Sequence, residues 1–441
     1  MNYIAGLGPQ SLPPSFARKH RWTLLFSLII FTACGLETSE SADTVADRSY
    51  EAHYRVRIDP AEAVADVTLN IRQSGHLLRE LNFPSVSSAI SGFGGDGEIT
   101  RNGDTLQWLL PAEGGELRWQ VRVAHPRGKN TFDAWLGPDW GMFRAEDVIP
   151  RARTRSLKGA TSNTSLTFDL PRGWSVVTEY SGVSDPIVIN RPERRFDQPT
   201  GWIVVGDIGV RRETIAGVQV AVAGPQGHAV RRMDMLALLN WTLPELVALL
   251  PEPPERLTIV SAGEPMWRGG LSAPASLFIH ADRPLISENA TSTLVHEAFH
   301  AALSLQSVAG ADWIVEGLAE YYSLELLKRG GAITSRRYDT AITDQADWAS
   351  QSNSLCGEAS TGATTALAVT VFRQLDQEIR DKTASASDLD TLLGHLLALG
   401  APVDVDMLSD RAAEIIGEPS DALHSDNLPG CTRMTPDDSK H

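Results

Sequence analysis

The stretch STLVHEAFHAALSL, residues 292–305, places His296, Glu297 and His300 inside a run of apolar and small residues. On a helix, residues four positions apart lie on one face, so the two imidazoles can present nitrogens to one metal ion. Glu297 lies to one side, where it can reach a water on that metal without ligating it. The alternative is a helix that carries a few polar residues on its solvent face. The surrounding sequence decides between the two interpretations.

A second predicted helix follows and carries two more carboxylates. Fifteen residues separate His300 from Glu316, so this helix can fold back beside the first and offer Glu316 as a third ligand. Glu320 shares its face and can accept the distal N–H of a ligating histidine. Two solvated helix carboxylates are the alternative, but the helix is otherwise apolar around Trp313 and Leu318. We therefore predict that His296, His300 and Glu316 bind Zn²⁺, that Glu320 orients a ligand, and that Glu297 is the catalytic base.

The segments HEAFH and WIVEGLAEYY together resemble the gluzincin zinc peptidases. More narrowly, they resemble the group that contains the M1 aminopeptidases and the M61 glycyl-aminopeptidase-like proteins. In that group H-E-x-x-H is followed by W-x-x-E-G-x-x-x-Y, and a β domain precedes the catalytic domain. The similarity extends over residues 200–375. It implies a thermolysin-like, mostly helical catalytic domain, Zn²⁺ as the cofactor, and a peptide or protein substrate.

One departure from the group concerns the substrate amine. M1 enzymes carry G-A-M-E-N and M61 enzymes a similar G-G-L-E-H, whose Glu helps to bind a free amine, whereas this chain reads GGLSA with Ser272 in that position. A buried ammonium without a counter-charge is strongly disfavoured. We therefore expect a poor aminopeptidase, unless another acid such as Glu264 or Glu358 takes that role.

A second departure concerns the phenol that stabilises the oxyanion in M1 enzymes. If Gly362 is the glycine that opens the matching late helix, Ala359 stands where the tyrosine would be. Tyr321, Tyr322 and Tyr338 are candidate donors, and packing is the alternative role for all three.

The N-terminal segment has the features of a lipoprotein leader. Arg18, Lys19 and Arg21 precede an apolar core that runs from Trp22 to Ala33, which is short for a bilayer span but suits a signal peptide. The core ends in FTAC, which resembles a bacterial lipobox with Cys34 as the lipidated residue. An ordinary membrane anchor is the alternative. We expect a bacterial cell-envelope protein, held by this lipid anchor alone and facing the periplasm or exterior.

Cysteine usage agrees with an exported protein. With Cys34 lipidated, Cys356 and Cys431 remain as a possible disulfide, and two unpaired buried thiols are the alternative. The formal net charge of −16 disfavours nucleic acid and anionic lipid surfaces as partners, because both bind clustered Lys and Arg.

The hydrophobic pattern divides the 441 residues into four parts. We expect a signal peptide at 1–33, a polar tether at 34–49, a β domain at 50–224 and the zinc domain at 225–435. Segments such as HYRVRID and ELRWQVRVAH alternate with period two, which predicts an antiparallel, sandwich-like β domain. Later segments have helical spacing, and we expect the first of them to break at Pro244. The predicted fold class is thus a β domain followed by an α/β, mostly helical domain.

The function that these features favour is zinc-dependent hydrolysis of peptide bonds, with water activated by zinc and Glu297. The alternative is a catalytically impaired, zinc-bearing scaffold of the cell envelope that binds peptides or a partner. The intact Glu297 favours hydrolysis, because a purely structural zinc site needs no base, while Ser272 and the missing phenol favour the scaffold. A chance motif in a β-rich binding protein is the third possibility.

Overall fold

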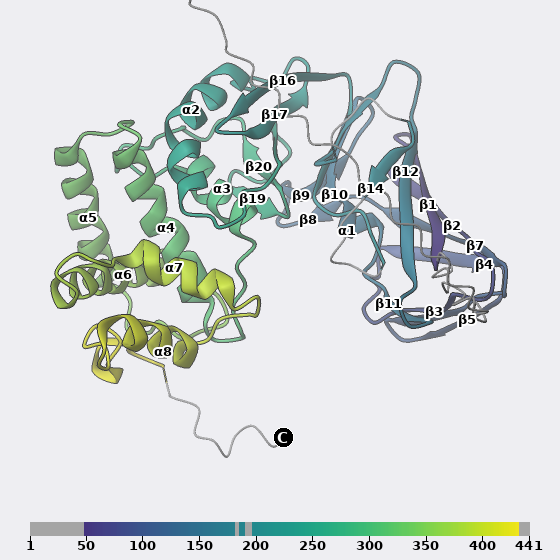
Figure 1. The fold of residues 1–441 in the computed structure, drawn as a ribbon. Coiled ribbons are helices and arrows are strands. Elements are labelled where there is room, and N and C mark those ends of the chain that lie inside the picture. The colour runs from purple at the N-terminus through teal and green to yellow at the C-terminus, as the bar shows by residue number, and fades with distance from the viewer. Residues whose placement is uncertain (1–47, 181–184, 190–195, 432–441) are drawn as a thin grey trace, which may run out of the picture. The chain divides into compact units, whose positions relative to one another are not determined.

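The computed structural model describes residues 48–180, 185–189 and 196–431, and its N-terminal half is built from strands (Figure 1). The short helix α1 (Ala145–Val148) interrupts them. The strands are β1 (Ser49–Asp59), β2 (Val64–Arg72), β3 (Leu78–Phe83), β4 (Ile90–Gly95), β5 (Glu98–Asn102), β6 (Thr105–Leu109), β7 (Gly114–Arg122), β8 (His125–Pro126), β9 (Phe132–Leu136), β10 (Trp140–Arg144), β11 (Arg153–Ser156), β12 (Thr161–Asp169), β13 (Ser175–Val177), β14 (Ile187–Ile189) and β15 (Trp202–Gly206).

These strands pair into sheets in the orders β14-β12-β1-β2-β7-β4, β11-β3-β6-β5 and β13-β15-β10-β9-β8. Pairing is antiparallel except between β1 and β12. The period-two pattern expected from the sequence is present in β1, where Tyr54 and Val56 are buried and Arg55 and Arg57 are exposed. Alternation of this kind lets one face of a sheet pack on a core while the other contacts water.

Strands β10 and β15 are instead buried on both faces. Phe143 and Ile203 belong to the core of the N-terminal sheets, whereas their neighbours Met142 and Trp202 pack with Phe278 in a separate cluster. Because successive side chains of a strand point to opposite faces, this sheet forms a layer shared by two cores. It therefore joins the N-terminal β structure to the sheet that carries the site.

The second half contains one further sheet in the described part of the chain, ordered β16-β17-β18-β20-β19, followed by helices. Its strands are β16 (Ile208–Ile215), β17 (Val218–Pro225), β18 (Arg256–Ala262), β19 (Gly270–Ala273) and β20 (Ser276–His280). The helices are α2 (Arg232–Ala248), α3 (Thr293–Leu303), α4 (Asp312–Arg329), α5 (Ser335–Ala349), α6 (Ala363–Lys382), α7 (Leu389–Ala398) and α8 (Val405–Ile416), with a 3₁₀ turn at Ser425–Asn427. Sheets followed by a mixed, mostly helical half confirm the predicted fold class.

Two details differ from the expectations. The change of sheet falls between β15 and β16, so β16 and β17 hydrogen-bond into the second sheet, although the sequence placed the change at residue 224. Period-two alternation identifies a strand but does not say which sheet it joins. Helix α2 also continues through Pro244 rather than breaking there. Leu243 and Leu246 on either side are buried, and this packing holds a helix that loses one backbone hydrogen bond at the proline.

Helix α3 packs against β19 and β20 on one side and α4 on the other, and α4 in turn contacts α6 (Figure 1). One continuous core cluster runs beneath these elements. Among the described residues, no helix combines the length and the apolar character that a membrane crossing requires.

Candidate metal centre and cleft

Helix α3 presents the two histidines from a well-defined start. Ser292 is the N-cap residue, and its hydroxyl oxygen accepts a hydrogen bond from the backbone N–H of Val295 at 3.3 Å. This bond satisfies one of the free donors of the first turn. Phe299, which is 1% exposed, stacks on Tyr322 of α4 and holds α3 in the core. With the helix fixed in this way, His296 and His300 face α4.

Helix α4 supplies the carboxylates. It is buried along most of its length, and Trp313 and Leu318 are 0% exposed. Glu316 and Glu320 lie one turn apart and point toward α3, where they are only partly exposed. A carboxylate on so apolar a helix needs a partner to offset its loss of hydration.

The structure brings His296, His300 and Glu316 together. One nitrogen or oxygen of each lies within 4.8 Å of the others. Glu316 reaches both rings: its Oε2 is 3.4 Å from His296 Nε2 and its Oε1 is 3.4 Å from His300 Nε2. The two Nε2 atoms are 3.1 Å apart. Two imidazole nitrogens and one carboxylate oxygen form the donor set of many catalytic zinc sites, which keep a fourth position for water or substrate.

The second ring nitrogen of His296 tests whether a cation fits this cluster. His296 Nδ1 lies 3.0 Å from Glu320 Oε2, and a carboxylate can only accept there, so Nδ1 carries the proton. In the neutral ring the lone pair is then on Nε2, which faces His300 Nε2 and Glu316. A lone pair that points at other electron-rich atoms is stabilised by a cation between them. The residues therefore fit a zinc ion.

The pKa values of His296 and Glu316 are both shifted in favour of the charged form. Burial by itself lowers the pKa of His296, but hydrogen bonds to Glu316 and Glu320 outweigh it and raise that pKa to about 10. Burial also opposes ionisation of Glu316, but hydrogen bonds to the two histidines lower the pKa of this carboxyl. The site thus favours positive charge between these carboxylates, a role that a proton or a metal ion can fill.

Glu297 is positioned by the edge strand β19. A Cβ atom at Gly270 would lie 2.7 Å from Glu297 Cγ and 2.6 Å from Thr293 Cγ2, so only glycine lets β19 pass this close to α3. Burial raises the pKa of Glu297, and the two nearby histidines and a hydrogen bond with Ser272 act in the opposite direction. A buried carboxyl with a raised pKa beside a metal site is suited to accept and release a proton.

An open cleft of about 540 Å³ reaches this cluster, although His300 is not part of its lining. Its lining comes from α3, α4, α5, the start of α6, the loop that follows β20, and β19 with the loop before it. Its lining includes His296, Glu297, Glu316 and Glu320 together with Trp267, Arg268, Gly269, Gly270, Arg283, Pro284, Ser287, Asn289, Thr291, Thr293, Gln345, Trp348, Ser360, Thr361, Gly362, Thr365 and Ala366.

The three candidate tyrosines do not line this cleft. Tyr321 and Tyr322 donate hydrogen bonds to Asp376 (3.3 Å) and Asp390 (2.9 Å), and Tyr338 donates to Glu325. All three are buried in the core beneath α4 and α5. Their phenols serve internal polar contacts and do not reach the cleft, which excludes them as donors to an oxyanion there.

Ser272 and the two acids considered for binding a substrate amine, Glu264 and Glu358, also lie outside the lining of the cleft. Ser272 occupies the end of β19 and contacts Glu297. Glu264 pairs with Arg268 at 3.3 Å, and neither Glu264 nor Glu358 lines the cleft. Every carboxylate in the described lining thus belongs to the cluster around the histidines.

Helix α5, which the sequence did not lead us to expect, contributes to the cleft. Its buried Gln345 donates from Nε2 to Glu320 Oε1 at 3.2 Å, and Trp348, 43% exposed, lines the cleft. The sequence does contain features typical of a helix here: Thr334 is its N-cap, and Tyr338, Ile342 and Gln345 recur at helical spacing. Because most residues between these positions are polar, the buried face of the helix is hard to recognise from the sequence.

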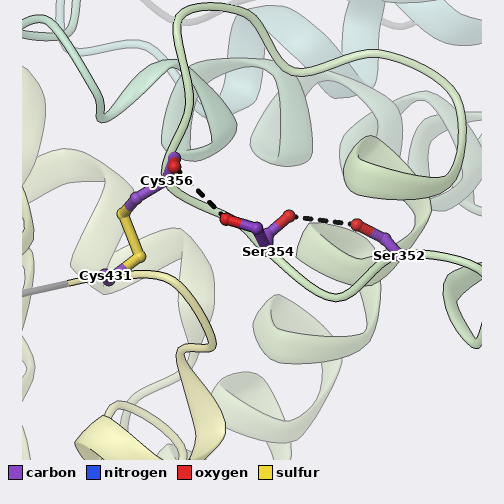
Figure 2. Close-up of a disulfide and its surroundings, with 4 residues drawn as sticks. All are labelled: Ser352, Ser354, Cys356 and Cys431. Carbon is purple, nitrogen blue, oxygen red and sulfur yellow. Dashed lines mark hydrogen bonds between the residues drawn. A yellow bond between two sulfur atoms is a disulfide. The ribbon is translucent and has the colours of Figure 1, made fainter.

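Cys356 and Cys431 form a disulfide (Figure 2). It joins the loop before α6 to the C-terminal segment, and the backbone N–H of Leu355 donates to Pro429 at 2.8 Å beside it. The same loop continues to Ser360, whose backbone N–H donates to Asp312 at 2.7 Å. The disulfide therefore anchors a loop that supplies part of the cleft. Cys34 lies outside the described residues.

Comparison with known proteins gives structural likeness only. No protein-family model and no curated protein matches the chain. An aminopeptidase N family protein from Idiomarina loihiensis matches in structure with a TM-score of 0.65 and 16% identity, over 87% of this chain and 77% of that one. A point variant of an M1 zinc metallopeptidase from Deinococcus radiodurans matches with a TM-score of 0.55 and 15% identity, over 88% of this chain and 95% of that one. The chain thus shares the fold of these two structures, while its resemblance to the gluzincin peptidases, and to the M61 group among them, stays a prediction.

Proposed function

We propose that this protein hydrolyses peptide bonds with a zinc ion held by His296, His300 and Glu316. The observation that carries the proposal is the convergence of these side chains, within 4.8 Å, beside the buried Glu297 in an open cleft. The fold of M1 zinc metallopeptidases supports it at a coarse level. When bound, zinc polarises a scissile carbonyl and lowers the pKa of a water molecule.

The chain's own residues perform the remaining steps. Glu297 accepts the proton of the attacking water and passes it to the leaving amine, which requires a carboxyl whose pKa is raised by burial. Glu320 holds the Nδ1 proton of His296, so that Nε2 is free to ligate. Gln345 holds Glu320 in turn. The indole of Trp348 offers an exposed apolar surface to a substrate side chain.

The test separates metal binding from chemistry. Purified protein should hold about one zinc per chain. His300→Ala should lose most of it, whereas Glu297→Gln should keep the zinc and lose hydrolysis of a mixed peptide library by at least about a hundredfold. Metal content and peptide cleavage are measured on the same samples. Equal zinc content in both variants would refute the ligand assignment.

A zinc-bearing peptide-binding scaffold is the second candidate, favoured because no tyrosine belongs to the described lining of the cleft. Its signature would be full zinc content, measurable peptide binding and no cleavage by the unaltered chain.

The location belongs to the same proposal. An anchor at Cys34 would hold the protein in a bacterial envelope, and the Cys356–Cys431 disulfide supports an oxidising compartment. Mass spectrometry of membrane-extracted protein should find Cys34 lipidated and N-terminal. An intact peptide that spans Phe31 to Cys34 would contradict the lipid anchor.

A further inference from the structure

The charges in the cleft are unevenly distributed. The carboxylates that line its described part are Glu297, Glu316 and Glu320, and each already faces a histidine or the proposed metal. Apart from His296, which belongs to the same cluster, the remaining lining residues are neutral except for two arginines. A substrate cation would therefore find no free counter-charge in the described lining, whereas a substrate anion would find a guanidinium.

Of those arginines, Arg268 is already compensated. Its guanidinium pairs with Glu264 at 3.3 Å and with Asp282 at 2.7 Å. Arg283 differs, because it forms no ion pair with any carboxylate in the part of the chain that the structure describes, and it is exposed. An arginine without an ion pair can bind a carboxylate in a bidentate way, here through the N–H groups of Nη1 and Nη2 that remain free.

Arg283 is also held in place. Its Nη2 and Nε donate to Thr293 Oγ1 at 2.9 and 3.3 Å, and its backbone carbonyl accepts a hydrogen bond from Arg231. Thr293 is the first residue of α3, where the partial positive charge of the helix terminus also favours an anion. A pre-oriented guanidinium loses less conformational freedom when it binds a ligand.

The position of Arg283 relative to the proposed base follows from α3. Thr293 and Glu297 lie one helical turn apart on the face that contacts Gly270, so their Cβ atoms are about 5–6 Å apart. An extended peptide advances about 3.3–3.6 Å per residue. A carboxylate on Arg283 thus belongs to a residue within two or three positions of the bond beside Glu297.

We infer that Arg283 selects substrates that carry a carboxylate close to the scissile bond, supplied either by an acidic side chain or by the peptide's C-terminus. This inference rests on the proposed hydrolytic function and specifies its substrate class. The bound carboxylate forms a bidentate pair with the guanidinium, which fixes the position of the peptide relative to Glu297. Peptides with a neutral or cationic group at that place lose this contact.

The first arm of the test uses cleavage by the zinc-loaded full chain. N-acetylated, internally quenched peptides place one Glu or one Gln at each of three positions on either side of the cleaved bond. A second set compares a free C-terminal carboxylate with its amide. We expect kcat/KM to be roughly ten- to a hundredfold higher for the acid at one position. The Glu scan and the terminal set distinguish the two sources of the carboxylate.

Variants of Arg283 test whether this residue causes the preference for acidic peptides. Arg283→Gln should bring the acid-to-neutral ratio close to one, and Arg283→Lys should retain part of it, because lysine keeps the charge but not the bidentate geometry. Arg336→Gln is the matched control: it removes one exposed arginine on the nearby helix α5, outside the cleft, and should leave the ratio unchanged. An acid preference that survives Arg283→Gln would overturn the inference.

The second arm of the test measures peptide binding, so its result does not depend on cleavage. Labelled Glu and Gln peptides are titrated into zinc-loaded Glu297→Gln protein, with and without Arg283→Gln, and their Kd values are compared by fluorescence anisotropy. Tighter binding of the acid that disappears with Arg283 supports the inference, even if no peptide is cleaved and the hydrolytic function fails. Equal binding of both peptides refutes it, even if neutral peptides are cleaved and the hydrolytic function stands.

Discussion

At the scale of single residues, the centre depends on where protons are held. In the proposed zinc site, His296 would ligate through Nε2 with the proton on Nδ1, and Nδ1 lies 3.0 Å from Glu320 Oε2, which accepts that proton's hydrogen bond. Gln345 keeps Glu320 in place, although its own Oε1 is buried without a hydrogen-bond partner among the described residues. Such supporting contacts orient a ligand and raise its basicity.

The first prediction at this scale concerns Glu320. Glu320→Gln should weaken zinc affinity by roughly ten- to a hundredfold, because an amide oxygen holds the Nδ1 proton less strongly than a carboxylate does. Competition with a chelator measures the affinity. Glu252→Gln, which neutralises an exposed acid outside the cleft, should leave it unchanged. Equal affinity in all three proteins would mean that Glu320 does not orient His296.

At the scale of elements, the close approach of helices sets where the proposed ligands lie. Gly317, next to Glu316, lies where α4 meets α6, and a Cβ there would be 2.5 Å from Ala368 Cβ and 3.0 Å from Phe372 Cε2. Only a residue without a side chain permits this contact. The packing of α6 against α4 therefore determines where α4 places Glu316 relative to α3.

The element-scale prediction compares two helical glycines. Gly317→Ala should destabilise the protein by roughly 1–2 kcal/mol, because overpacking outweighs the gain of about 1 kcal/mol in helix propensity. Gly394→Ala is the control, since nothing lies within 4 Å of its Cβ position in α7, and it should stabilise by about 0.5–1 kcal/mol. Urea unfolding of both variants gives the signs. A stabilised Gly317→Ala protein would show that α4 and α6 have room to separate.

At the scale of the whole molecule, a covalent link connects the C-terminal segment to the cleft. The Cys356–Cys431 disulfide (Figure 2) spans 75 positions of the sequence. The enclosed segment contains α6, α7 and α8. Closing a long loop reduces the conformational freedom of the unfolded chain, which stabilises the folded state.

The whole-molecule prediction follows from that loop. Cys431→Ser should lower the free energy of unfolding by about 2–4 kcal/mol. The matching experiment is reduction: dithiothreitol should shift the urea midpoint of the unaltered protein in the same direction and leave that of Cys431→Ser unchanged. A midpoint that does not respond to the reductant would argue against a stabilising disulfide.

The sequence alone was sufficient for features that depend on local spacing. The helical repeat places His296 and His300 on one face whatever surrounds them, and a Glu–x–x–x–Glu pair shares a face for the same reason. Alternating strands followed by helical segments predicted the fold class, because each period reflects how an element buries its apolar side.

Only the tertiary structure decided what depends on distant contacts. Whether Tyr321, Tyr322 and Tyr338 face the cleft or the core is set by the partners that α4 and α5 meet, and aspartate and glutamate side chains elsewhere in the fold hold all three phenols. Strands β16 and β17 belong to the second sheet because β17 pairs with β18 and β16 pairs with β17. Arg283 became a candidate for substrate binding only when the fold placed it beside Thr293 and away from any carboxylate of the described chain, since pairing between distant side chains has no period that a sequence can display.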